Sequence, residues 1–497
     1  MKKILIVGGG TAGWMTAALF GKLFQGLYDI ELVESEAIGT VGVGEATIPA
    51  IKKYNDLIKL DEAEFMRRTQ ATFKLGIEFI DWIRPGHRYI HGFGVIGQDW
   101  EWLRCHQYWL RANERGQARP FADYSINTAA GLANKFMHAR ADMLESPIGH
   151  IAYAFQFDAT LYAKYLRSLA EHHGIRRTEG RIVDVATTRD GDIASVTLED
   201  GQVVEADFFI DCSGFRGLLI EQTLKTGYDD WSRWLPCDRA MAVPCKRTEP
   251  LIPLTRATAR DAGWQWRIPL QHRTGNGLVY SSRHIDDDGA EALLLANLDG
   301  EQLANPNKLR FTSGKRRKMW NRNCVALGLA AGFLEPLEST SIHLVQSAAV
   351  RLVRMFPNGA TDQATIDEFN RQEDFEWERT RDFIVLHYWA NERDGEFWKY
   401  CRTMELPATL QRKIDVWRSN GRIFREDEEL FAEESWIQVL IGQGIMPRSH
   451  DPLVAIKSDE QISQFLGNIA TTIARCVDVM PTHDDYVRNY CPADLIQ

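Results

Sequence analysis

One glycine pattern near the N-terminus constrains the fold of this chain more than any other feature. A Gly-x-Gly-x-x-Gly motif spans residues 8–13, between an apolar strand over 4–7 and an expected helix over 11–24. A second apolar strand is expected over 30–33, and Glu34 follows it directly. Such glycines permit a tight turn, so a pyrophosphate can lie at the helix N-terminus while the acid binds a ribose. The residues expected at the nucleotide are Gly8, Gly10, Thr11, Ala12, Gly13 and Glu34.

Two later segments look like the strands and turns that flavoproteins place beside their cofactor. Residues 207–216 predict a strand that ends in a turn between Asp211 and Gly214. Residues 323–332 predict a strand followed by a helix that begins near Gly328. The positive N-terminal end of such a helix would suit the flavin pyrimidine or a nearby anion. Together with the first motif, these segments favour FAD over NAD.

The remaining chain extends this α/β core. A helix is expected from Asp158 to about His173, and strands over 181–186, 193–198 and 203–210 follow, joined by hairpin turns. The next hundred residues mix strands with Trp-rich stretches, and the chain beyond Thr340 is mainly helical. We therefore predict a flavin-monooxygenase-like Rossmann core, a mixed-sheet substrate region and a helical C-terminal part. In one compact unit, the expected segments are 1–80, 151–225 and 321–345 for FAD, 81–150 and 226–320 for the substrate side, and 346–497 for the helical part.

The composition disfavours several classes of partner. The 58 Lys and Arg residues against 68 Asp and Glu residues give a formal net charge of −10, which disfavours nucleic acid and anionic membranes. Eight scattered cysteines show no metal-ligand spacing, so no metal is expected. The longest smooth apolar run, 325–333, is too short to cross a bilayer, and the run over 4–7 is too short for a signal peptide. These features predict a cytoplasmic protein with reduced thiols.

Longer motifs identify a family to which nearly the whole chain is similar. They are Gly8-Gly-Gly-Thr-Ala-Gly13-Trp14, Gly42-Val-Gly44-Glu-Ala46-Thr47-Ile-Pro49, Thr72-Phe-Lys74-Leu-Gly76, His91-Gly-Phe93-Gly94, Trp264-Gln-Trp266-Arg-Ile268-Pro269 and Glu335-Pro-Leu337-Glu338-Ser-Thr340. With them the chain resembles the FADH2-dependent halogenases, whose best-known members chlorinate or brominate tryptophan. The Trp-x-Trp-x-Ile-Pro signature is highly specific to that family. The resemblance implies further FAD contacts at Gly44, Ala46, Thr47, Val183, Asp211, Gly214, Gly328 and Leu337.

The resemblance also implies a mechanism with two catalytic residues. In that family FADH2 and O2 form a flavin hydroperoxide, which a halide attacks to release hypohalous acid. This oxidant would cross an internal tunnel to Lys74, where either an amine is halogenated or an ammonium polarises the oxidant through a hydrogen bond. Both roles remain open. Glu338 would stabilise the positive ring intermediate, accept its proton or help to activate the oxidant.

The resemblance assigns a halide site and a barrier as well. The halide is expected at Thr340 and Ser341, where backbone N–H groups open a helix. Family members often carry glycine at the position of Ser341, so a chloride or bromide preference is left open. Bulky residues would keep the substrate away from the flavin, and they are Trp264, Trp266, Ile268 and Pro269.

The expected substrate is a flat, electron-rich ring. His91 and Phe93 match aromatic residues that sandwich an indole in the tryptophan enzymes, and Trp436 is a third candidate for this box. The acidic region 428–434 has no tyrosine with which to clamp an amino-acid backbone. Free indole, a substituted indole or a larger indole compound is therefore expected at least as readily as tryptophan.

Two other functions remain compatible with the sequence. One is a flavin-dependent aromatic monooxygenase, which would use NAD(P)H itself, and the other is a non-catalytic flavin-binding protein. Because the chain has one dinucleotide motif, reduced flavin is expected from a separate NAD(P)H-dependent flavin reductase. A homodimer is left open.

Overall fold

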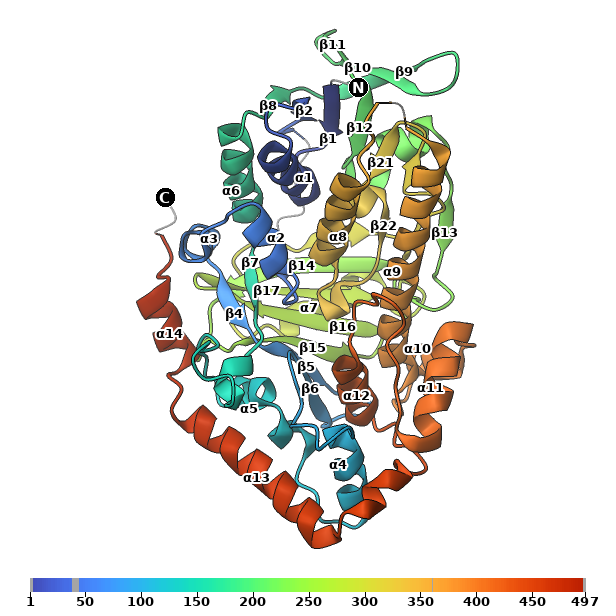
Figure 1. Ribbon diagram of the computed structural model, residues 1–497. Helices are drawn as coiled ribbons and strands as arrows, with labels where there is room; N and C mark the ends of the chain where they lie inside the picture. The colour runs from blue at the N-terminus through green and yellow to red at the C-terminus, as the bar shows by residue number, and fades with distance from the viewer. Residues whose placement is uncertain (1–2, 38–43, 360, 495–497) are drawn as a thin grey trace.

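The glycine-rich turn follows the central strand of a six-stranded sheet, at the top of Figure 1. The computed structural model describes residues 3–37, 44–359 and 361–494, so Gly42 lies outside the described residues. The five strands from β21 to β8 pair in parallel, and β20 is antiparallel. In spatial order the strands are β20 (Trp320–Asn321), β21 (Cys324–Ala326), β12 (Phe208–Asp211), β1 (Lys3–Val7), β2 (Asp29–Glu34) and β8 (Arg176–Glu179).

Two helices cover this sheet where the sequence predicts them. Helix α1 (Thr11–Leu23) packs against α6 (Ala159–His172) beside the sheet (Figure 1). Helix α6 begins at Asp158, whose side chain accepts hydrogen bonds from the backbone N–H groups of Thr160 and Leu161, as an N-cap should. The predicted Rossmann-like core is therefore present.

Two details of the sequence prediction are wrong. The strand expected over 203–210 is two strands: β11 (Val203–Glu205) pairs antiparallel with β10 (Ile193–Leu198), whereas β12 belongs to the parallel sheet. The apolar pattern continues through the change of sheet, so periodicity does not reveal the break. The helix expected at Gly328 is only a short 3-10 turn, Gly328–Ala330, and the long helix begins at Ser341.

A seven-stranded mixed sheet comes mainly from the segment 226–320, which the sequence assigns to the substrate side, and takes two further strands from earlier in the chain. Its only parallel pair joins β5 to β15, so it combines an early segment of the chain with a middle one. In spatial order its strands are β18 (Asn307–Arg310), β14 (Arg239–Lys246), β17 (Arg273–Tyr280), β16 (Gly263–Pro269), β15 (Leu254–Arg260), β5 (Gly76–Ile80) and β6 (Arg88–Gly92). The small sheets contain β3 (Gly44–Ala46), β7 (Ala154–Asp158) and β4 (Thr72–Lys74); β9 (Ile182–Thr187) with β10 and β11; and β13 (Tyr228–Asp230), β19 (Gly314–Arg316) and β22 (Gly332–Phe333).

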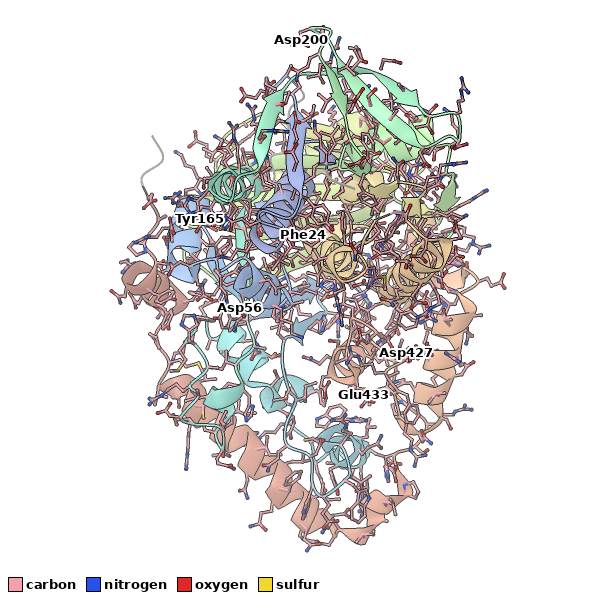
Figure 2. All side chains as sticks on the ribbon, turned by 45° about the horizontal axis from the view of Figure 1, so that its top comes forward. Phe24, Asp56, Tyr165, Asp200, Asp427 and Glu433 are labelled. Atoms are coloured by element: carbon pink, nitrogen blue, oxygen red, sulfur yellow. The ribbon has the colours of Figure 1, made fainter. Side chains whose placement is uncertain are left out.

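The C-terminal part is mainly helical, as predicted, and its last helices, drawn in orange and red, lie in the lower half of the molecule in Figure 1. One cluster of buried apolar side chains joins both large sheets to these helices, while Figure 2 shows Asp200 at the tip of the outlying β10–β11 hairpin. Within the described ranges, no helix is both long and apolar enough to span a bilayer. The remaining helices are α2 (Ile51–Leu57), α3 (Glu62–Thr69), α4 (Cys105–Glu114), α5 (Ile126–Leu132), α7 (Asp287–Ala296), α8 (Ser341–Arg354), α9 (Gln363–Trp389), α10 (Glu396–Thr403), α11 (Ala408–Asn420), α12 (Glu433–Gly442), α13 (Asp459–Asp478) and α14 (His483–Tyr490).

Candidate active site

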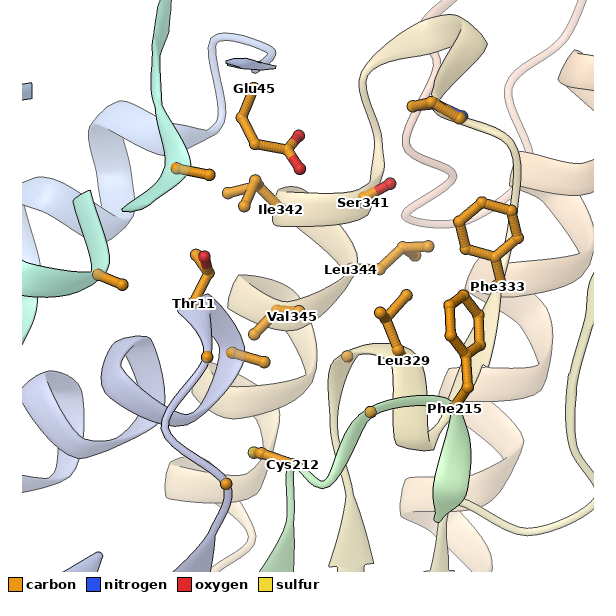
Figure 3. Close-up of a pocket in the computed structure, with 18 of the residues that line it drawn as sticks. Thr11, Glu45, Cys212, Phe215, Leu329, Phe333, Ser341, Ile342, Leu344 and Val345 are labelled. Carbon is orange, nitrogen blue, oxygen red and sulfur yellow. The ribbon is translucent and has the colours of Figure 1, made fainter. Parts of the chain in front are cut away.

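A cavity of about 780 Å³ opens at the carboxyl ends of the parallel strands (Figure 3). Its wall combines the turn after β1, the end of β2, the turn after β12, one face of β16 and the start of α8. This is where open α/β sheets bind their ligands. The predicted site residues that line it are Gly8, Gly10, Thr11, Ala12, Glu34, Gly44, Ala46, Gly214, Trp264, Trp266, Ile268, Gly328, Leu337 and Ser341.

The glycine-rich turn has the shape that a dinucleotide requires. Gly8 has φ +113°, and a Cβ there would lie 2.3 Å from the Cys212 carbonyl oxygen. A Cβ at Gly13 would lie 1.8 Å from the Gly8 carbonyl oxygen, whereas a Cβ at Gly10 would meet no atom of the described residues within 4 Å. No side chain caps the start of α1 and no acidic residue lies in its first turn, so this helix end suits a pyrophosphate.

Four other predicted cofactor or barrier residues have structural contacts instead. Thr47 Oγ1 donates a hydrogen bond to the Phe155 carbonyl oxygen at 2.8 Å, which ties β3 to β7. The Asp211 carboxylate accepts hydrogen bonds from three backbone N–H groups and thereby holds the turn that follows β12. Gly13 packs on the Gly8 backbone. The Pro269 carbonyl accepts a hydrogen bond from Thr72 and so fixes the strand that carries the predicted lysine.

Val183 does not line the cavity. This residue is 55% exposed, and the neighbouring Ile182 lines the cavity. Consecutive side chains of a strand point to opposite faces, so the Val183 side chain faces away from the cavity, and a contact of this residue with FAD stays a prediction.

The predicted barrier forms one face of β16. Trp264, Trp266 and Ile268 alternate along the strand and all line the cavity. Trp264 Nε1 donates a hydrogen bond to Glu335 Oε2 at 2.9 Å. Sequence reasoning gave Glu335 no role, although burial raises its pKa to about 7. A Cβ at Gly277 would lie 1.9 Å from the Trp266 ring, so the glycine makes room for this wall.

Lys74 lies in the interior, at the end of β4. Its side chain is fully buried, and Nζ donates a hydrogen bond to Ser339 Oγ at 2.7 Å. Nζ also lies 5.3 Å from the centre of the Phe93 ring. Burial lowers the pKa of Lys74 to about 7, although the charge of Glu338 acts in the opposite direction. Ser339 lines the cavity, so the cavity reaches the hydrogen-bonding partner of the lysine.

Glu338 lies between two histidines and is fully buried. Its Oε2 is 2.8 Å from His91 Nδ1, and its Oε1 is 2.8 Å from His387 Nε2. Burial alone would raise the pKa of this carboxyl, but the two histidines outweigh it and lower the pKa to about 2. His387 was missed, because a lone histidine inside the long helix α9 gives no motif signal.

The start of α8 retains free polar groups beside the cavity. Thr340 is fully buried, and its Oγ1 has no hydrogen-bonding partner among the described residues. The Ser341 side chain lines the cavity, as Figure 3 shows. The helix has no side-chain cap and no acid in its first turn, so both predicted residues lie where an anion would be favoured.

The predicted aromatic box is closely packed. His91, Phe93 and Trp436 are all buried. Phe383 lies between two of them, with ring centres 5.6 Å from His91 and 4.8 Å from Trp436, and it stacks on Phe431 at 3.8 Å. Both phenylalanines escaped prediction, since apolar residues in helical or loop segments are usually part of the core.

Comparisons with known proteins agree with this geometry. The sequence profile of the tryptophan halogenase family matches residues 3–459. The chain is 34% identical to tryptophan 7-halogenase RebH of Lentzea aerocolonigenes, over 98% of both chains. The flavin-dependent halogenase Xcc4156 of Xanthomonas campestris is 48% identical, with a TM-score of 0.96 over 100% of this chain and 99% of that one. BrvH, a flavin-dependent halogenase of Brevundimonas sp. BAL3, is 43% identical, with a TM-score of 0.95 over 99% of each chain.

These matches cover both sheets, the cavity and most of the helical part. They favour a flavin-dependent halogenase over the monooxygenase and the non-catalytic protein that the sequence had left open. The chain belongs to the tryptophan halogenase family.

Proposed function

We propose that this enzyme uses reduced FAD, O2 and chloride or bromide to halogenate an indole ring, in free indole, a substituted indole or tryptophan. The observation that carries the proposal is the hydrogen bond from Lys74 to Ser339, a residue that also lines the cavity. A buried lysine is costly unless it has a function. Its position between the cavity and the aromatic residues suits a group that meets an oxidant and a ring.

The cavity fits FAD in its chemistry. The open start of α1 would take the pyrophosphate, and Glu34 at the end of β2 would take ribose hydroxyls. When bound, reduced FAD supplies, with O2 and a halide, the hypohalous acid on which halogenation depends. The backbone at Thr340 and Ser341 would hold the halide, with the Thr340 hydroxyl beside it, which no other described residue engages.

Side chains of the protein would carry out the remaining steps. With a pKa of about 7, Lys74 is present as both amine and ammonium at neutral pH, so its nitrogen can be halogenated or can donate a hydrogen bond to the oxidant. Glu338 is a carboxylate, and it would take the proton that the ring loses when the carbon–halogen bond forms. The face of β16 would exclude the ring from the flavin.

The proposed indole substrate does not need residues that clamp an amino-acid backbone. Residues 428–434 offer no tyrosine, and Glu429 is engaged by the Trp436 indole N–H and by Lys413. A neutral indole needs only aromatic surfaces, and each ring pair adds roughly 0.5–1.5 kcal/mol beyond burial. A separate NAD(P)H-dependent reductase would provide the reduced flavin.

A reconstituted reaction tests this proposal. The enzyme is combined with FAD, NADH, a flavin reductase, air and either chloride or bromide, and indoles, tryptophan and phenols are screened by mass spectrometry. We expect a halogen isotope doublet that disappears in Lys74→Ala and Glu338→Gln but persists in Lys53→Ala, a change at an exposed lysine. Hydroxylated product without halide dependence would contradict the proposal.

A further inference from the structure

Glu338 and His387 are in close contact in the interior of the protein. The two atoms that face each other, Glu338 Oε1 and His387 Nε2, are 2.8 Å apart. Neither atom has a hydrogen-bonding partner in the described part of the chain, so the close approach of the two is an ion-pair contact. Two bare lone pairs at this distance would repel each other, so one of the two atoms carries a proton.

The other ring nitrogen of His387 decides how many protons the ring holds. His387 Nδ1 lies 2.8 Å from the Phe383 carbonyl oxygen. A carbonyl only accepts hydrogen bonds, so Nδ1 carries a proton whatever happens at Nε2. If Glu338 is ionised, the ring therefore has protons on both nitrogens and is an imidazolium.

Neighbouring groups favour the ionised pair. His91 also meets Glu338, with Nδ1 2.8 Å from Oε2. Elsewhere in the described ranges, the titratable groups that interact with this carboxylate are Lys74 and Tyr89. The resulting pKa of Glu338, about 2, agrees with a carboxylate, and a fully buried carboxylate needs a nearby positive charge.

We propose that His387 is a positioning residue, which stays doubly protonated and holds Glu338 as a carboxylate in the orientation needed to receive a proton from the substrate ring. The catalytic role of His387 rests on the proposed function, but its protonation state does not. The bond to Phe383, one turn earlier in α9, fixes the ring plane, and packing against Phe79 at 4.7 Å limits its rotation.

Infrared difference spectroscopy tests the protonation state in FAD-free protein. Subtracting the spectrum of Glu338→Gln from wild type isolates the band of this one carboxyl, which we expect in its carboxylate form at neutral pH. In His387→Asn, which can keep the bond to Phe383 but lacks the charge, the band should shift to the protonated acid. His343→Asn is the matched control, because His343 Nε2 lies 2.8 Å from Glu376 in a separate pair.

Kinetics test the positioning role. In His387→Asn we expect kcat for halogenation to fall roughly 10- to 100-fold, as when a group that orients a catalytic residue is lost. The KM for the aromatic substrate and the release of hypohalous acid, trapped by a thiol reagent, should be unchanged. His387→Gln can restore a donor at the Nε2 position and should recover part of kcat. If the Asn variant does not fold, the Gln variant carries the spectroscopic test.

The possible failures are distinguishable. A Glu338 band that stays ionised in the folded His387 variant, or that shifts equally in His343→Asn, overturns the assignment of His387. If the band shifts as expected but wild type halogenates no aromatic compound, the proposed function fails while the protonation assignment stands.

Discussion

Burial of Lys74 has a measurable effect on stability. Its pKa falls from 10.5 to about 7 on folding, so between these pH values the unfolded chain holds a proton that the folded chain has released. As the pH falls below 10.5, the unfolded chain binds this proton and is stabilised, whereas the folded chain does not bind it until about pH 7. The stability that the protein has with a neutral Lys74 is therefore fully present above pH 10.5 and is lost as the pH falls towards 7. The interval is about 3.5 pH units at about 1.4 kcal/mol each, which amounts to roughly 5 kcal/mol.

Replacing the lysine with methionine removes this proton and keeps the length of the side chain. The variant loses the hydrogen bond to Ser339, but that cost does not depend on pH. From the two pKa values, the unfolding free energy of Lys74→Met relative to wild type should be about 2 kcal/mol larger at pH 7 than at pH 9. The variant should also lose halogenase activity.

Urea unfolding of the FAD-free proteins, followed by circular dichroism at both pH values, measures this difference. Lys53→Met, at an exposed position, is the control and should show no such change with pH. If the difference between Lys74→Met and wild type is the same at pH 7 and pH 9, Lys74 does not titrate near 7 in the folded protein, and the reasoning from its burial is refuted.

Three further outcomes are expected. Gly10→Ala should weaken FAD binding, measured by flavin fluorescence, without changing the melting temperature of the apoprotein, whereas Gly13→Ala should lower both because its Cβ meets the backbone. Trp264→Phe removes the donor to Glu335 and should cost roughly 1–3 kcal/mol in urea unfolding; an unchanged midpoint and slope would count against this contact. Glu338→Gln should stop ring halogenation while trapped hypohalous acid is still formed, and loss of both products would place the residue earlier in the reaction.

The sequence predicts best the parts of the fold that local rules determine. The turn at residues 8–13 is constrained by backbone contacts that only glycine permits, so its position and its neighbours could be stated in advance. The strand expected over 203–210 failed, because β11 and β12 share one apolar pattern although they pair with different sheets. Choice of partner strand is a tertiary property, and periodicity contains no information about it.

In the candidate site, too, local motifs reveal some residues, whereas others are brought together only by the fold. Lys74 and Ser341 were predicted from motifs and their neighbouring residues. Ser341 lines the cavity, and Lys74 donates a hydrogen bond to Ser339, which also lines it. His387 and Phe383 come from the middle of α9, where nothing in the local pattern separates a residue facing the site from a residue of the core. The side chain of Ile182, and not that of Val183, lines the cavity, because neighbouring residues of a strand face opposite sides.

The four consecutive residues 338–341 have a consequence for how such an enzyme can change. Glu338 faces two histidines, Ser339 binds the lysine in a left-handed backbone conformation with φ +58°, Thr340 is buried and Ser341 borders the cavity. Inserting or deleting one residue would rotate every later side chain away from its partner, so the length of this junction is tightly constrained. The substrate site would be altered more easily through α12 and the loop before it, which contact the aromatic residues without touching the junction.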